Sequence, residues 1–186
     1  MAEYVKVKLV KTWGDNDYYK AGNIVYVSKN GDDTNAGLHQ NNPVLTITKA
    51  LTLASAGDTI HVYPGDYEEV FPLTVPVGVT VKGHSMRTVS ITPTVGTNNN
   101  DAFLLNGEVT IEDLTIKDFY FNSGANEGYA FKFANNYNNV VFQQDPGRSP
   151  YIRNVSVITK GTTTSVADPR GYDSADAGRG ALVDGN

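Results

Sequence analysis

Turn-forming residues divide this chain into many short segments, and their frequent recurrence is the feature that most limits its fold. Glycine, proline, asparagine and aspartate recur between short runs rich in valine, isoleucine, threonine, tyrosine and phenylalanine. Such runs favour strands, whereas the separating residues favour turns. The pattern predicts an all-β protein with strands at Tyr4–Val10, Ile24–Ser28, Thr59–Tyr63, Thr74–Val75, Val79–Lys82, Val89–Thr92, Ala102–Leu105, Val109–Ile111, Leu114–Ile116, Tyr129–Phe133, Val140–Gln143 and Val155–Thr159.

Only Thr46–Ser55 has the periodicity of a helix. Its apolar residues recur every three or four positions, which places them on one face: Ile47, Ala50, Leu51 and Ala54. Thr46 suits the N-cap, and Gly57 suits the position just after the helix. We expect this helix to cover the open end of the β-structure; an ordinary surface helix on a β-sandwich is the alternative.

Two internal repeats favour stacked turns of a solenoid over a sandwich. Residues 111–116 and 152–157 match in residue class at a spacing of 41 positions (111 to 152). Two turns of about 20 residues each would produce this spacing. A weaker repeat relates residues 79–83 to residues 109–113.

The order of motifs in residues 26–93 resembles a known superfamily. A strand and a Gly/Asn/Asp-rich loop at residues 27–37 precede the helix, and residues 56–67 read Ala-Gly-Asp-Thr-Ile-His-Val-Tyr-Pro-Gly-Asp-Tyr. This order is similar to the opening of right-handed parallel β-helices of the pectate-lyase-like superfamily, in which a helix caps the coil. The resemblance implies a right-handed parallel β-helix (solenoid) with a short capping α-helix. The fold serves lyases, hydrolases, esterases, adhesins and virus fibres, so it leaves the function open.

We expect three parts along the chain. Residues 1–22 are predicted to form an N-terminal β-hairpin, with Trp13, Tyr18 and Tyr19 docking onto a partner or packing into the core. Residues 23–165 are predicted to form the capped β-helix, and residues 166–186 a Gly/Ala/Asp-rich tail that continues the coil or acts as a linker. No second cap is visible after residue 159, so a partner chain or further coil is expected to cover that end.

Composition excludes several functions. The chain has 186 residues, no cysteine and a net charge of −5. Disulfides, zinc–thiolate sites and cysteine nucleophiles are therefore impossible. The sequence has no basic stripe for nucleic acid, no export signal and no apolar run long enough to span a bilayer. We predict neither a nucleic-acid partner nor membrane insertion.

The ionisable residues do not form a recognisable catalytic or metal motif. Glycan cleavage requires convergent carboxylates, but the candidates are scattered: Asp66, Glu68, Glu69, Glu112, Asp113 and Asp118. Gln143, Gln144 and Asp145 superficially resemble an esterase site, but the remaining motif is missing. The oxygens of Asp32, Asp33 and Asn35 could ligate calcium, although a plain turn is favoured, and His39, His61 and His84 fit no triad. We predict no catalytic residue, metal or cofactor.

The layout, together with residues 168–185, also resembles virion structural proteins of tailed phages, particularly contractile-tailed phages of cyanobacteria. This resemblance implies a non-enzymatic tail, baseplate or fibre component, assembled in the host cytoplasm as a homotrimer with other virion proteins. Two alternatives are a tailspike-like polysaccharide depolymerase and a glycan-binding module acting on host surface glycans. Tyr120, Phe121 and Tyr137 would then form an aromatic surface for the glycan or partner.

Overall fold

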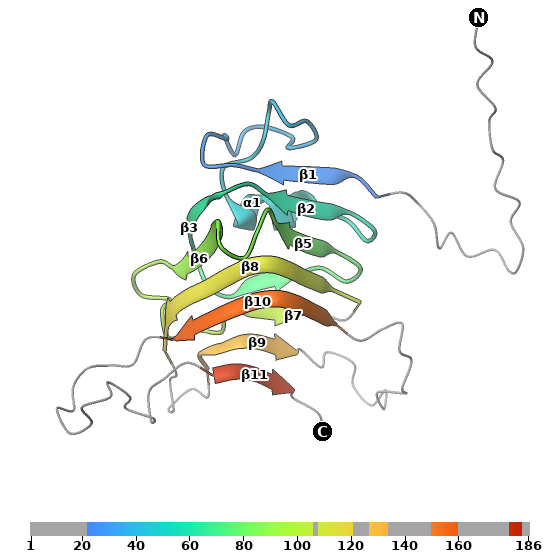
Figure 1. Ribbon diagram of the computed structural model, residues 1–186. Helices are drawn as coiled ribbons and strands as arrows, with labels where there is room; N and C mark the ends of the chain where they lie inside the picture. Colours follow the sequence, from blue (N-terminus) through green and yellow to red (C-terminus); the bar gives the residue numbers. More distant parts are fainter. Residues whose placement is uncertain (1–21, 106–107, 121–126, 134–149, 160–178, 184–186) are drawn as a thin grey trace, which may run out of the picture.

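A computed structural model describes residues 22–105, 108–120, 127–133, 150–159 and 179–183 (Figure 1). These residues form one short helix, α1 (Ile47–Leu53), and strands β1 (Ile24–Val27), β2 (Thr59–Val62), β3 (Gly65–Glu69), β4 (Leu73–Val75), β5 (Thr80–Gly83), β6 (Val89–Pro93), β7 (Phe103–Leu105), β8 (Thr110–Phe119), β9 (Tyr129–Phe133), β10 (Tyr151–Thr159) and β11 (Arg179–Val183). The prediction of an all-β chain is confirmed.

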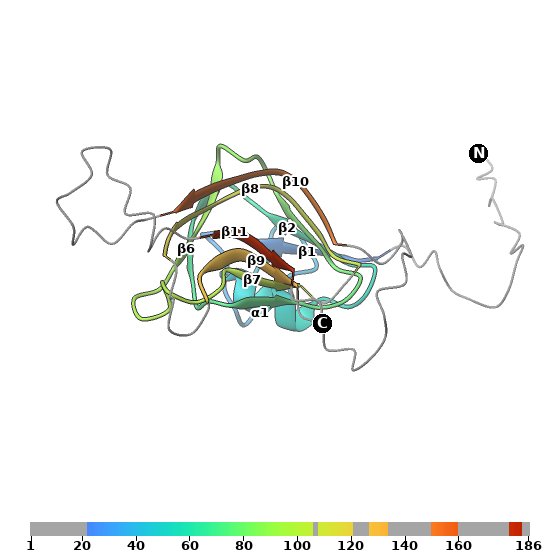
Figure 2. The same cartoon turned by 90° about the horizontal axis from the view of Figure 1, so that it is seen from below.

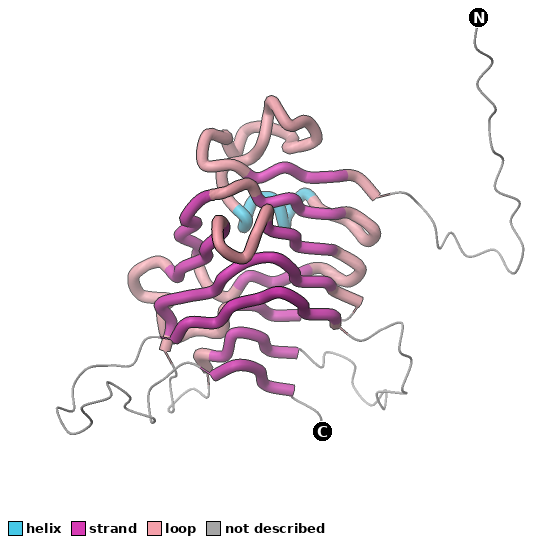
Figure 3. Tube along the Cα trace, in the orientation of Figure 1, coloured by secondary structure: helices cyan, strands magenta, loops and turns pink. Residues whose placement is uncertain are grey.

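The strands form two parallel sheets, and the larger sheet divides into two stacks that share β8 and β10, so that the chain returns to three sides in the same order. The first stack contains β1, β2, β5, the first part of β8 and β10. The second contains β3, β6 and the later parts of β8 and β10, and the third contains β4, β7, β9 and β11. In Figure 2, β8 and β10 bend across two sides, whereas β7, β9 and β11 follow another side. Figure 3 shows the resulting layers of strands.

The core lies between the stacks and repeats from strand to strand. Val25, Ile60, Val81 and Ile111 occupy matching positions in β1, β2, β5 and β8, and each is at most 1% exposed. Burying a side chain of this size contributes about 1.5 to 3 kcal/mol. Stacking equivalent apolar residues therefore stabilises the parallel register.

The register confirms both internal repeats and corrects their period. Residues 80–82 pair with residues 110–112, and residues 111–116 pair with residues 152–157. The spacing of 41 residues therefore separates adjacent strands, β8 and β10, and not strands two turns apart. It is long because the chain passes through β9 and longer connections before it returns to the first stack.

Several strands differ from the sequence prediction. β3 and β11 were not predicted, β8 is continuous where two short strands were expected, and β10 begins at Tyr151 instead of Val155. β3 lacked a recognisable signal because Tyr67 is the only large apolar residue on its buried side, next to the buried carboxylate Glu69. The predicted hairpin and the strands expected at residues 4–10 and 140–143 lie outside the described residues.

The predicted helix is confirmed and lies near the amino-terminal end of the stacks (Figure 1). The hydroxyl of Thr46 accepts a hydrogen bond from Lys49 N–H at 3.0 Å, as expected of an N-cap. Ile47, Ala50 and Leu51 are buried, and α1 packs against β1, β2, β3 and β4. The helix therefore covers the core at this end.

Three carboxylates hold α1 in place. Glu69 accepts hydrogen bonds from Ile47 N–H (2.6 Å) and from the N–H and hydroxyl of Thr48 (3.1 and 2.6 Å). Asp33 accepts from the N–H groups just before the helix, at residues 45 and 46. Asp58 accepts from Asn23 N–H and from Ser55 N–H beyond the helix end. Both ends of α1 are thus tied to the strands and to the preceding loop.

We predict that Glu69→Ala destabilises the protein by about 2 to 3 kcal/mol, because it leaves buried N–H groups at the helix start without an acceptor. Glu68→Ala is the matched control, since Glu68 is adjacent but exposed, and it should change stability by less than about 0.5 kcal/mol. Urea unfolding of both variants measures the difference. Equal effects would contradict the anchoring role of Glu69.

Candidate functional site

A row of polar and aromatic residues crosses the outer face of the first stack. Tyr26, His61, Lys82, Glu112 and Arg153 occupy matching positions in β1, β2, β5, β8 and β10. We call these five residues the outer ladder. Side chains alternate between the two sides of a strand, so this row faces outward while its neighbours fill the core.

Ion pairs connect the outer-ladder residues of β5, β8 and β10. Lys82 Nζ lies 2.6 Å from Glu112 Oε1 and 3.1 Å from Asp113 Oδ2, and Arg153 Nε donates to Glu112 Oε2. The side chain of Glu112 is only 6% exposed. The hydrogen bond from Arg153, followed by that from Lys82, holds the pKa of Glu112 below its usual 4.5, although burial opposes this shift. Glu112 therefore remains an anion that joins three strands.

The outer-ladder residues of β1 and β2, Tyr26 and His61, belong to an aromatic cluster. The rings of Tyr26 and Tyr63 are stacked with centroids 6.1 Å apart, and His61 meets both edge-on at 6.2 and 5.2 Å. The ring of His84 lies 6.3 Å from that of His61. Burial lowers the pKa of His61, and the neighbouring His84 and Lys82 lower it further. The uncharged imidazole is therefore favoured, and the cluster offers partly exposed rings for stacking.

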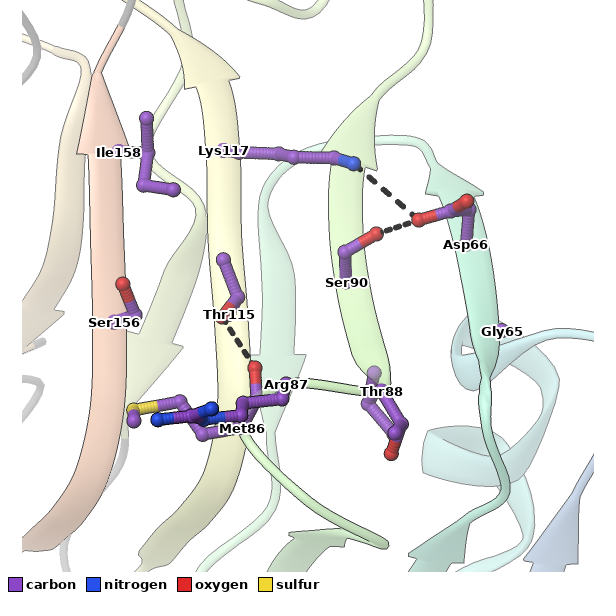
Figure 4. Close-up of a pocket in the computed structure, with 11 residues that line it drawn as sticks. Gly65, Asp66, Met86, Arg87, Thr88, Ser90, Thr115, Lys117, Ser156 and Ile158 are labelled. Atoms are coloured by element: carbon purple, nitrogen blue, oxygen red, sulfur yellow. Dashed lines mark hydrogen bonds and ion pairs between the residues drawn. The ribbon is translucent and has the colours of Figure 1, made fainter.

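An open groove of about 520 Å³ crosses the outer side of the second stack. Figure 4 shows its lining residues, which come from β3, β6, β8, β10 and the turn between β5 and β6. Asp66 accepts hydrogen bonds from Ser90 Oγ and from Lys117 Nζ, the latter at 3.3 Å. The Ser90 contact is the larger cause, ahead of Lys117, of a lowered pKa at Asp66. The groove thus has a fixed carboxylate beside an ammonium group.

The turn between β5 and β6 forms one wall of the groove and is held by a hydrogen bond from β8. Thr115 Oγ1 donates to the carbonyl oxygen of Met86 at 2.7 Å, and the neighbouring Arg87 is exposed in the lining. Hydroxyl groups of Thr88 and Ser156 complete the polar surface (Figure 4). Such a mixture of charges and hydroxyls suits a polyhydroxylated ligand better than an apolar one.

Of the aromatic residues named from the sequence, the described part of the chain includes Tyr120 alone. Tyr120 is half-buried, and its N–H donates to Asn98 C=O at 2.9 Å. Trp13, Tyr18, Tyr19, Phe121 and Tyr137 lie outside the described residues, so their docking or binding roles stay predictions. The cluster of Tyr26, His61, Tyr63 and His84 was missed. The strand register would have revealed it, because those residues are neighbours only after β1, β2 and β5 are aligned.

The candidate carboxylates have separate structural surroundings. Glu69 anchors α1, Asp66 lies in the groove, and Glu112 and Asp113 bind Lys82. Glu68 and Asp118 are exposed. Glu112 and Asp113 lie side by side, but cations hold both, and neither has the raised pKa of a general acid.

The remaining ionisable residues complete this picture. The turn interpretation of the Asp32–Asn35 loop is confirmed, since Asp32 accepts from Thr34, Asp33 from the start of α1, and Asn35 donates to Pro43 C=O. His39 is exposed, and the rings of His61 and His84 lie near each other, a contact that the sequence did not reveal. Residues 143–145 lie outside the described part of the chain.

Comparison with known proteins finds one similarity. Residues 29–118 match a family described as protein of unknown function (DUF1565), and this family is of the parallel β-helix type. The match covers loop, helix and strands from the end of β1 to β8. Neither the curated proteins nor the solved structures include a match. Among the described residues, no helix is long and apolar enough to cross a membrane.

We predict that the contribution of Glu112 to stability depends on pH. Its pKa is lowered by folding, so the stabilisation is present above 4.5 and is lost as pH falls through the lower folded value. Glu112→Gln should therefore unfold more easily than wild type by about 1 to 3 kcal/mol near neutral pH, with a smaller gap near pH 3. Urea titrations at both pH values test this, with Glu68→Gln as control. A gap that widens in acid would contradict it.

Proposed function

We propose that the three stacks are the sides of one right-handed parallel β-helix, and that this chain serves as a stiff, non-enzymatic structural module. The observation that carries this proposal is the return of the chain to the same three parallel stacks in one register. Connections between parallel strands are right-handed in nearly all proteins, which supports the handedness. The match of residues 29–118 to a family of β-helix type supports the architecture.

Stacked turns make a module stiff because each turn satisfies the backbone hydrogen bonds of its neighbours. Here salt bridges between β5, β8 and β10 add cross-links on the outside of the coil. The carboxylates around α1 support a structural role as well, since the buried Glu69 and Asp58 and the half-buried Asp33 are engaged in anchoring it. A stiff module of this kind can hold partner proteins at a fixed distance and bind them without catalysing a reaction.

We further place this module in a phage virion, as a tail, baseplate or fibre component that assembles with other virion proteins as a homotrimer. Support comes from the resemblance of the overall layout and of residues 168–185 to virion structural proteins. A β-helix suits this setting because a particle requires long, stiff elements that resist proteolysis.

If this assignment holds, peptides of the chain will be found in purified virions at a copy number divisible by three. Quantitative mass spectrometry of particles, normalised to a capsid protein, measures this number. The soluble fraction of the same lysate is the control. Absence from the particles would overturn the virion assignment, and release of reducing ends from host glycans by the purified chain would overturn the non-enzymatic one.

A second candidate function is glycan binding, which is favoured by the groove and the aromatic cluster. Tyr63 offers a ring for stacking on a sugar face, and Arg87 offers a guanidinium in the groove. Sugar hydroxyls would find acceptors and donors in Asp66, Ser90 and Lys117.

For this second function we predict that Tyr63→Ala and Arg87→Ala each weaken binding to host surface glycan at least about fivefold, which corresponds to the loss of one good contact. Affinity electrophoresis in gels that contain the glycan measures the change. Val95→Ala is the control, because Val95 is 97% exposed and belongs neither to the groove lining nor to the aromatic cluster. Unchanged mobility of the wild type in the glycan gel would rule out this function.

A further inference from the structure

The two ends of the stacks are finished differently. At the amino-terminal end, the second edge of β1 bonds to the following loop: Tyr26 N–H donates to Gly37 C=O at 2.8 Å and Ser28 N–H to Val44 C=O at 2.9 Å. At the other end, β10 pairs with β8 and β11 pairs with β9. Within the described residues, neither of these last strands has a second neighbour. Their outer edges therefore offer backbone groups to a further strand.

Apolar residues of β10 are incompletely covered. Ile111 and Ile116 in β8 are 0% exposed. Of their partners in β10, Ile152 is half-buried and Val157 is 36% exposed. In the described part of the chain, the apolar side chains of β10 are thus covered by β8 on one side only. A further strand on the other side would bury their exposed surface.

The outer ladder ends on a positive charge. Lys82, Glu112 and Arg153 alternate in sign across β5, β8 and β10. Arg153 uses Nε to bind Glu112, while its side chain remains 51% exposed. A guanidinium has further N–H donors beyond Nε, so a carboxylate in the next strand would continue the alternation.

The corner next to the ladder also repeats. Gly83, Asp113 and Asn154 follow the ladder residues in successive strands. Asp113 and Asn154 have positive φ values of 60° and 50°, and Asn154 Nδ2 donates to Asp113 Oδ1 at 3.1 Å. A Cβ at Gly83 would lie 2.2 Å from the carbonyl oxygen of Asp113. Glycine, asparagine and aspartate adopt the positive φ of positions 113 and 154 most readily, whereas the close carbonyl oxygen explains glycine at position 83.

We propose that the outer edge of β10, which has no second neighbour among the described residues, binds in parallel register a strand from a different protein with the pattern apolar, acidic, Gly/Asn/Asp, apolar. This inference rests on the proposed docking function and deepens it by naming the surface and the chemistry of the partner. The apolar residues of the partner cover Ile152 and Val155, and its carboxylate meets Arg153. The third residue continues the corner below Asn154.

The sequence indicates why the partner is not a second copy. In the whole chain this pattern occurs once, at Ile111-Glu112-Asp113-Leu114. These residues belong to β8, which already pairs with β5 on one side and β10 on the other. A folded second copy therefore cannot offer them to the edge of β10.

A labelled synthetic peptide with the sequence of residues 109–119 tests the proposal, because it carries the pattern in its natural context. Fluorescence anisotropy with the full chain should show binding, and Arg153→Ala should weaken it at least about fivefold. Lys82→Ala is the matched control: it also removes a cationic partner of Glu112 but lies away from the edge, so peptide affinity should not change. A peptide with Glu112→Lys should bind at least about tenfold more weakly than the original.

Three results would overturn the proposal: no binding of the peptide to the wild-type chain, equal losses in Arg153→Ala and Lys82→Ala, or self-association of the chain that Arg153→Ala abolishes. The last result would assign the edge to a second copy. The proposed function fails separately. A chain that is present in virions but does not bind the peptide keeps its structural role and loses only this docking surface.

Discussion

Parallel hydrogen bonding between successive passages of the chain is the constraint on which the rest of this structure depends. Strands of three to five residues, such as β4 and β3, have little stability alone. They persist because each finds a partner in register from another passage, and because Val25, Ile60 and Val81 stack in the core at the same level. A shift by one residue would turn these side chains outward and bury the outer ladder.

The same constraint creates a problem at each end, where backbone groups and apolar surface lose their partners. The amino-terminal end solves it with polar residues: Asp33, Asp58 and Glu69 fix α1, and the loop after β1 bonds to the edge of that strand. In the sequence, Asp33 attracts attention as a candidate for calcium binding and Glu69 as a candidate for catalysis. Their hydrogen bonds instead explain them as parts of the cap. At the other end, the incompletely covered Ile152 and the exposed guanidinium of Arg153 are the features from which we propose a docking partner.

Local patterns in the sequence predicted elements that depend on neighbouring residues. The periodicity of residues 46–55 located α1, and alternation located β1, β2, β5 and β9. β3 and β11 were missed because their pairing depends on strands far along the chain. The aromatic cluster escaped for the same reason: Tyr26 and His61 are separated by the loop and helix, and only the register makes them neighbours. The internal repeats of the sequence reflect this register. Their spacing differs from one pair of adjacent strands to the next, so the number of residues per turn could not be read from it.

Cysteine cross-linking tests the central claim most directly, because the natural chain has no cysteine. Thr59, Thr80 and Thr110 are half-buried and occupy matching positions in β2, β5 and β8. Adjacent strands are about 4.8 Å apart, within the range that a disulfide spans, whereas β2 and β8 are roughly twice as far apart. Mild oxidation should therefore link Thr59→Cys to Thr80→Cys, and Thr80→Cys to Thr110→Cys, in the respective double variants. Efficient linkage of Thr59→Cys to Thr110→Cys, without linkage of the adjacent pairs, would contradict the parallel stack.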